Sequence, residues 1–123
     1  KRSASLLALP LLLALGAGAH AACVYPQAPQ TLPNGSKATK EEMLAAQAQV
    51  KEYSKSVQEV YLPCLESEKN ESITALDNMN PEAQKANIES VHAKKHNAAL
   101  DELQAVAARW SVELKAYSAA QKK

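Results

Sequence analysis

The sequence has no phenylalanine and only three glycines among its 123 residues. Two of the glycines fall within residues 1–22, so Gly35 is the one glycine in the remainder. A phosphate-binding loop needs several glycines to bring its backbone close to a ligand, and the sequence therefore excludes a loop of that kind. Abundant alanine and few aromatic residues favour helices around a thin core over a sheet or a deep ligand pocket.

The chain also lacks an excess of charge of either sign. Its formal net charge is +1, and it becomes −1 when residues 1–22, which hold two basic residues and no acidic one, are removed. The basic doublets Lys94-Lys95 and Lys122-Lys123 are short, and doublets of this kind are usually solvated surface. A near-neutral chain with dispersed charges has no electrostatic footprint for nucleic acid, so we expect no nucleic-acid partner.

Residues 1–22 have the features of a secretory signal peptide. Two basic residues precede an apolar run over 6–17, and the small residues Ala19 and Ala21 are separated by one position, as at a signal-peptidase site. An uncleaved membrane anchor and a lipoprotein acylated at Cys23 are the alternatives. We therefore expect a periplasmic or secreted protein with no membrane span after signal cleavage.

Residues 23–38 form a predicted extended arm. Pro26, Pro29 and Pro33 fix backbone angles and remove hydrogen-bond donors, which favours a partly polyproline-like conformation. Asn34-Gly35 then signals a turn. The rest of the chain, residues 39–123, is the predicted helical domain.

An apolar stripe predicts the first long helix, over about 39–77. Its members follow one another at steps of three and four: Met43, Ala46, Val50, Tyr53, Val57, Val60 and Cys64. Thr39 and Glu42 have the spacing of a capping box at its start. Pro63 opposes a regular helix there, so the sequence allows a kink or a break, and we favour a kinked continuation. Beyond Pro63 the apolar residues are one position out of the earlier phase.

A second stripe predicts a helix over about 81–119, with Asn80 as its cap and Pro81 in its first turn. The stripe consists of His96, Leu100, Leu103, Ala107, Trp110, Leu114 and Tyr117, and Val91 and Val106 widen it. Laying the two stripes antiparallel pairs Met43 with Tyr117, Val50 with Trp110, Val60 with Leu100 and Cys64 with His96. The predicted fold is all-α, an antiparallel two-helix hairpin with coiled-coil-like packing.

The two cysteines predict one disulfide, between Cys23 and Cys64, which staples the arm to the first helix. Closing a loop of about 40 residues would contribute about 4 kcal/mol on the chain-entropy account. The alternatives are a lipidated Cys23 with a free Cys64, or a redox pair. A redox pair normally has C-x-x-C spacing, which these cysteines lack.

The sequence offers one weak metal-site pattern. His92 and His96 are four residues apart on the second helix, and Glu89 lies one turn before His92. Two imidazoles at this spacing can share a metal ion, but a stable site needs further ligands. A solvated or packing role for the histidines is the alternative, and we predict no cofactor.

Four stretches give the chain a resemblance to an uncharacterised family of small secreted or periplasmic helical proteins of Gram-negative bacteria. They are Cys23-Val24-Tyr25-Pro26, then Ala38-Thr39 with Glu41-Glu42-Met43, then Tyr61-Leu62-Pro63-Cys64-Leu65, and residues 93–103. Pro63 departs from the pattern, because other members continue helically at that position. The resemblance implies a helical fold and export, and it implies no activity, substrate or cofactor.

No arrangement of residues predicts a catalytic site. The acidic residues are scattered at helix-surface spacings, and no serine, histidine and aspartate recur in a pattern that a hairpin could bring into a cleft. We predict a non-enzymatic exported protein that acts by contact with an unknown protein partner or by self-association. A periplasmic metal-binding protein that uses His92 and His96 is the alternative.

Overall fold

The computed structural model describes residues 22–76 and 79–123, and its regular elements there are all helical. They are α1 (Lys40–Lys55), a π-helical turn η1 (Ser56–Tyr61), α2 (Leu62–Thr74) and α3 (Pro81–Gln121). The predicted all-α class is therefore confirmed. The predicted signal peptide, apart from its last residue, and the predicted helix end at Asp77 lie outside the described residues.

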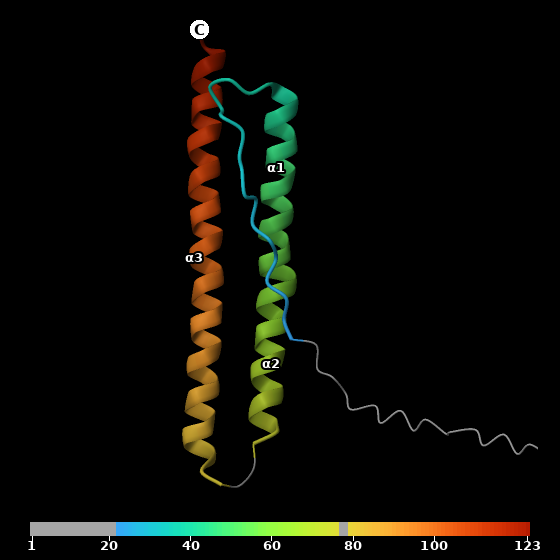
Figure 1. Ribbon diagram of the computed structural model, residues 1–123, viewed down its shortest axis with the longest axis vertical. Helices are drawn as coiled ribbons and strands as arrows, with labels where there is room; N and C mark the ends of the chain where they lie inside the picture. The colour runs from blue at the N-terminus through green and yellow to red at the C-terminus, as the bar shows by residue number, and fades with distance from the viewer. Residues whose placement is uncertain (1–21, 77–78) are drawn as a thin grey trace, which may run out of the picture.

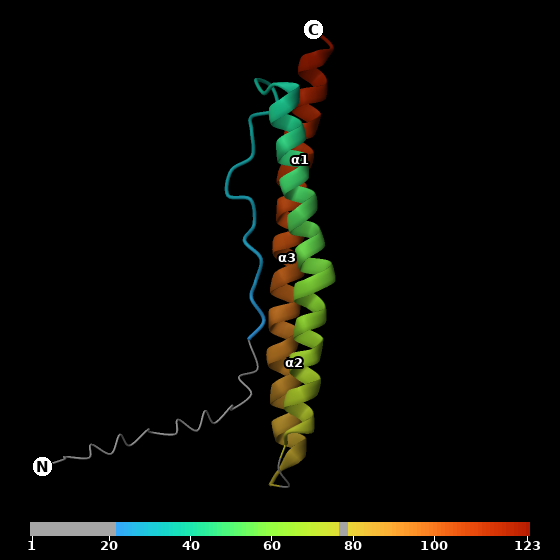
Figure 2. The same ribbon diagram turned by 90° about the vertical axis from the view of Figure 1, so that its right-hand side faces the viewer.

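The helices form two long rods that lie side by side and run in opposite directions, with the arm beside them. Figure 1 shows α1, η1 and α2 following one another along one column, while α3 forms the other column and ends next to the start of α1. Helix α3 contacts both α1 and α2. Figure 2 shows that the arm runs along one side of this helix pair.

The start of α1 follows from its sequence. The side chain of Thr39 accepts a hydrogen bond from the Glu42 backbone N–H at 3.2 Å, and the Glu42 carboxylate accepts one from the Thr39 N–H at 2.7 Å. These two bonds satisfy donors that the first helical turn would otherwise leave unpaired. The predicted capping box is confirmed.

The helical backbone continues through Pro63 because the turn before it is widened. Proline has no N–H, and in a regular α-helix its ring would clash with the carbonyl group four residues earlier. Here η1 precedes it, and the Leu62 N–H donates to the oxygen of Val57, five residues back. The wider π-helical turn accommodates one additional residue, and α2 then resumes a regular helix.

This additional residue changes which side chains face α3. The prediction that Val60 and Cys64 continue the apolar stripe is wrong: Val60 is 67% exposed, and Cys64 is half-buried. Tyr61 and Leu65 take the inward positions instead, with 8% and 1% of their surfaces exposed. The apolar residues after Pro63 were out of phase because the π-helical turn shifts the buried side by one residue.

Helix α3 begins at Pro81, after Asn80 at the N-cap in a left-handed conformation with φ of 58°. The position of the predicted cap is confirmed, but the Asn80 side chain makes no capping hydrogen bond. Glu82 lies in the first turn, where its charge favours the positive end of the helix dipole. The helix extends to Gln121, two residues beyond its predicted end.

The core combines all the helical elements with one residue of the arm. Its buried members are Ala28, Tyr53, Val57, Tyr61, Leu65, Ala99 and Val106. On α3 the most buried positions are thus Ala99 and Val106, whereas Ala107 is exposed and Leu114 is 42% exposed. The buried side of α3 is rotated away from the predicted stripe because the arm covers the seam from one side.

Among the described residues, no helix is both long enough and apolar enough to cross a membrane.

Candidate functional site

The predicted disulfide is present between Cys23 at the start of the arm and Cys64 in the first turn of α2. The two Cα atoms are 5.8 Å apart, and the bond closes a sequence separation of 41 residues. Because the two sulfur atoms are bonded to each other, neither is available for a thioether to lipid in this state. The bond fixes the arm where it first meets the helices.

Two residues after Cys23, Tyr25 holds the arm against the helices through contacts with two other tyrosines. Its ring meets the ring of Tyr61 edge to face, with centroids 5.0 Å apart and planes at 86°. Its hydroxyl lies 2.6 Å from the hydroxyl of Tyr53. Burial, and then the hydrogen bond to Tyr25, raise the pKa of Tyr53 well above its usual range. Tyr53 is therefore neutral at ordinary pH.

The arm has further contacts between Ala28 and Gly35. Ala28 is buried in the core, and Arg109 Nη2 lies 3.5 Å from the carbonyl oxygen of Pro29. At the far end, the Gly35 N–H donates to Glu113 Oε2 at 2.6 Å. A Cβ at position 35 would overlap the Glu113 backbone oxygen, so glycine is required there for the close approach to α3.

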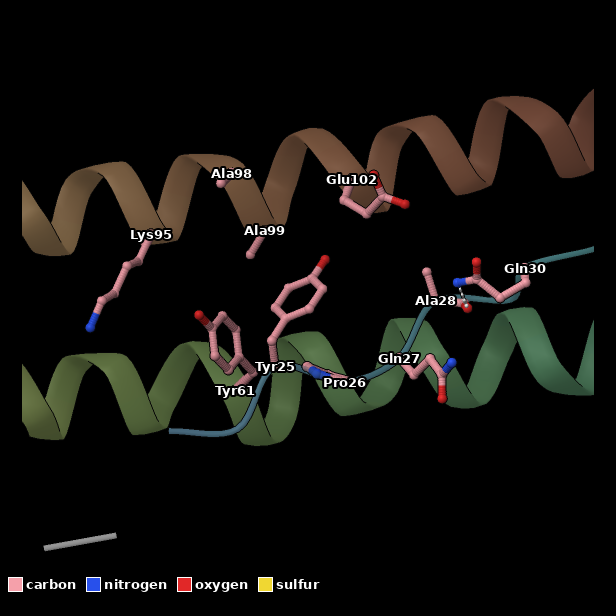
Figure 3. Close-up of a pocket in the computed structure, with 10 residues that line it drawn as sticks. All are labelled: Tyr25, Pro26, Gln27, Ala28, Gln30, Tyr61, Lys95, Ala98, Ala99 and Glu102. Atoms are coloured by element: carbon pink, nitrogen blue, oxygen red, sulfur yellow. Dashed lines mark hydrogen bonds between the residues drawn. The ribbon is translucent and has the colours of Figure 1, made fainter. Parts of the chain in front are cut away.

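An open groove of about 670 Å³ lies between the arm and α3, and we call it the arm–α3 groove. Figure 3 shows Ala99 of α3 pointing toward the ring of Tyr25, with the ring of Tyr61 beside it. The groove is lined by Tyr25, Pro26, Gln27, Ala28, Gln30, Tyr61, Lys95, Ala98, Ala99 and Glu102. A second groove, of about 630 Å³, separates the arm from α1 and includes Gln49 and Glu52.

Opposite charges border the arm–α3 groove at two positions of α3. Lys95 and Glu102 are seven residues apart, or about 10 Å at ~1.5 Å per residue. Lys95 Nζ lies 2.8 Å from Glu68 Oε1 on α2. This hydrogen bond lowers the pKa of Glu68 and raises the pKa of Lys95. Both side chains are more than a third exposed, so their pairing contributes little to stability.

The residues of the predicted metal site are only partly brought together. The rings of His92 and His96 are 5.8 Å apart, but Glu89 instead lies 3.9 Å from Lys85. The nearest carboxylate oxygen to His92 belongs to Glu66 on α2, at 3.4 Å from Nε2. The pKa of Glu66 is lowered, mainly by its hydrogen bond to Lys69.

His92 Nε2 is buried and makes no hydrogen bond in the described part of the chain, because the 3.4 Å approach of Glu66 lacks hydrogen-bond geometry. Within residues 22–76 and 79–123, no three histidine, cysteine or acidic side chains lie close enough together to hold a metal ion. Of the predicted metal ligands, the structure thus brings His92 and His96 together, and it places no third ligand beside them in the described part of the chain.

Sequence reasoning did not identify the grooves or the arm residues that form them. One signal was available: a polyproline helix has three residues per turn, so Tyr25 and Ala28 share one side of the arm. Both of these residues contact the helices. The contact between Gly35 and α3 depends on the fold of the whole chain and has no local signal.

Comparisons of the chain with protein-family models, with curated proteins and with solved structures gave no match. The resemblance to a family of exported helical proteins therefore stays a prediction.

Proposed function

We propose that this chain is an exported, non-enzymatic helical protein, periplasmic or secreted, that acts by protein–protein contact. The working unit is the helical hairpin with its arm fastened across one side. The disulfide supports the assignment of compartment, because disulfides persist mainly in oxidising environments. The signal-like residues 1–22 support it independently.

The arm–α3 groove is the contact site that we favour, with an extended polypeptide segment as its occupant. The helix pair already binds one segment of this kind, because the arm is extended, contains prolines and is held through Tyr25 and Ala28. The groove beside the arm is also lined by small apolar side chains of the helix pair, those of Ala98 and Ala99. A second extended segment could lie there, parallel to the arm.

The polar groups of the groove suit a peptide backbone. The amides of Gln27 and Gln30 can each donate and accept hydrogen bonds, as a peptide requires. Gln30 already donates to the Ala28 oxygen at 3.0 Å, which leaves its amide oxygen to accept from a ligand. Glu102 adds a negative charge that favours a basic residue in the bound segment. These groups can bind and orient a peptide segment, and none of them is a nucleophile paired with a base.

The compartment is tested by the intact mass of the protein recovered from the periplasm or medium, with and without reductant. We expect a chain that begins at Ala22 or Cys23 and gains two hydrogens on reduction. An added lipid on Cys23, or an intact segment 1–22 retained in the membrane, would contradict the proposal.

The contact site is tested by a photo-crosslinking residue placed at Ala98, in the groove. Val112 is the matched control, because it is also on α3, is 63% exposed and lies outside both grooves. We expect a cross-linked protein from position 98 and not from 112, and we expect Glu102→Lys to reduce its yield. Equal products from both positions, or none from either, would count against the groove.

A further inference from the structure

The helix pair has a second side that the arm does not cover. On α1, Ala48 and Glu52 line the groove next to the arm, whereas Gln47, Lys51 and Ser54 line a hollow that no arm residue enters. At about 100° per residue, these two sets are centred roughly 110° apart around the helix, so they belong to two different sides of it. We call the second side the uncovered face. Its hollows are lined by residues that include Leu44, Gln47, Trp110 and Leu114. Leu100 and Ala107 belong to the same side of α3 as Leu114, because they precede it at spacings of seven.

Large apolar side chains are incompletely buried on the uncovered face. Leu44 and Leu114 are 54% and 42% exposed, and Trp110 is half-buried. These three residues line a shallow hollow of about 200 Å³ between α1 and α3. Two helices alone cannot cover both sides of their seam, and the arm covers just one. Burying the remaining apolar surface would be favourable at about 25 cal/mol per Å².

We propose that a second copy of this chain packs on the uncovered face, with the two α3 helices antiparallel and a two-fold axis passing close to Ala107. Leu100 and Leu114 are each seven residues from Ala107, on the same side of the helix. Antiparallel pairing about Ala107 sets Leu100 of one copy against Leu114 of the other, twice. The small, exposed Ala107 lets the two helices approach closely at the axis.

The charges along α3 are consistent with pairing of identical surfaces. The strip next to Leu100, Ala107 and Leu114, at the same spacing of seven, consists of Asn97, Gln104, Ser111 and Ser118. It is uncharged over its whole length. In the antiparallel pairing, Gln104 of one copy lies near Ser111 of the other, and Asn97 lies near Ser118. No charge on this strip is therefore buried at the contact without a partner. The nearby Asp101 and Lys115 lie farther round the helix.

The uncovered face is large enough for a stable dimer. From Asn97 to Ser118 the strip is about 30 Å long at ~1.5 Å per residue, and two helices side by side are about 20 Å wide. Each copy would bury about 600 Å², or about 1,200 Å² in total, which is at the lower end of specific interfaces. The arm–α3 groove stays open in this dimer, so the inference does not depend on the proposed function.

Sedimentation equilibrium of the oxidised, exported protein tests the proposal. We expect a dimer at tens of micromolar, and we expect Leu114→Lys to raise the dissociation constant at least tenfold. Val112→Lys is the matched control, because Val112 is 63% exposed but lies about 200° around α3 from Leu114. It should leave the dissociation constant unchanged. A wild-type monomer at several hundred micromolar, or equal effects of the two substitutions, would overturn the proposal.

Two further variants test the axis and the antiparallel pairing. Ala107→Trp adds bulk at an exposed position of the monomer and should prevent close approach of the two copies. Leu100→Glu combined with Leu114→Lys places opposite charges across the axis, so the double variant should dimerise more tightly than either single variant. A parallel pairing would set like charges together and give the reverse order. Circular dichroism verifies that each variant folds, and cross-linking at Ala98 reports on the groove separately.

Discussion

The hydroxyl oxygens of Tyr25 and Tyr53 lie 2.6 Å apart and join the arm to α1 across 28 residues of sequence. Tyr53 is 4% exposed, whereas Tyr25 is 39% exposed, so the bond links a buried hydroxyl to one at the surface. The buried Tyr53 hydroxyl obtains a hydrogen-bond partner, and the arm obtains a fixed position. The arm is thus a component of the core as well as a cover for it.

Removing the Tyr53 hydroxyl should cost about 1 kcal/mol of unfolding free energy, because the surface hydroxyl of Tyr25 can turn to water. The pKa of Tyr53 is raised in the folded state by burial and by Tyr25. Its contribution to stability is therefore complete below the unfolded pKa, about 10, and is lost as the pH rises above it. Urea unfolding between pH 8 and 11 should show this loss in the wild type and less of it in Tyr53→Phe.

Tyr25→Phe provides the companion measurement. It removes the hydrogen bond and leaves the burial of Tyr53, which is the larger cause of the raised pKa. Tyr25→Phe should therefore still lose stability at high pH, and it should lose more than Tyr53→Phe does. If both variants kept the wild-type dependence on pH, Tyr53 would not be the group that is titrated.

The Cys23–Cys64 bond should make a large contribution to the stability of the chain. On the chain-entropy account, its separation of 41 residues corresponds to about 4 kcal/mol. We expect Cys23→Ser with Cys64→Ser to lower the unfolding free energy by roughly 2–4 kcal/mol, measured by urea unfolding. Reductant should destabilise the wild type to the same extent and leave the double variant unaffected. No difference between the two proteins would mean that the contacts of Tyr25 and Ala28 hold the arm without the bond.

Local rules and counting predicted the features that depend on a few neighbouring residues. The start of α1 follows from Thr39 and Glu42, the start of α3 from Asn80 and Pro81, and the disulfide from the presence of two cysteines in a chain predicted to be exported. Each of these features is decided by bonds within a short segment or by the absence of alternatives, so sequence alone was sufficient.

The features that depend on packing between distant segments could not be predicted. The sequence shows that Pro63 disturbs a helix, but not that a widened turn absorbs the disturbance and brings Tyr61 and Leu65 inward. Similarly, the alternative metal-site pattern took Glu89 as the carboxylate beside His92 and His96, because these three residues are spaced one turn apart on one helix. The carboxylate that approaches His92 comes from Glu66 on another helix.

The shift caused by the π-helical turn gives opposite expectations for two apolar residues. In a regular helix Val60 would be inside, but in the structure Val60 is 67% exposed and Leu65 is 1% exposed. We therefore expect Leu65→Ala to cost about 2–5 kcal/mol through lost burial and the cavity left behind. Val60→Ala should change the unfolding free energy by less than about 0.5 kcal/mol. Thermal or urea unfolding of the two variants distinguishes the registers, and a costlier Val60→Ala would contradict the π-helical turn.

Gly35 is the position where the turn of the arm meets α3 most closely, and its substitution tests that contact. In Gly35→Ala, the new Cβ would overlap the backbone oxygen of Glu113 and lie 2.9 Å from the backbone nitrogen of Tyr117. A helix backbone cannot yield as a flexible side chain can, so the turn must move away and break the bond from Gly35 to the Glu113 carboxylate. We expect a loss of about 1–3 kcal/mol in urea unfolding. Ser36→Ala removes an exposed hydrogen bond to Asn34 in the same turn and should cost less than about 0.5 kcal/mol. Equal effects of the two substitutions would place the turn away from α3.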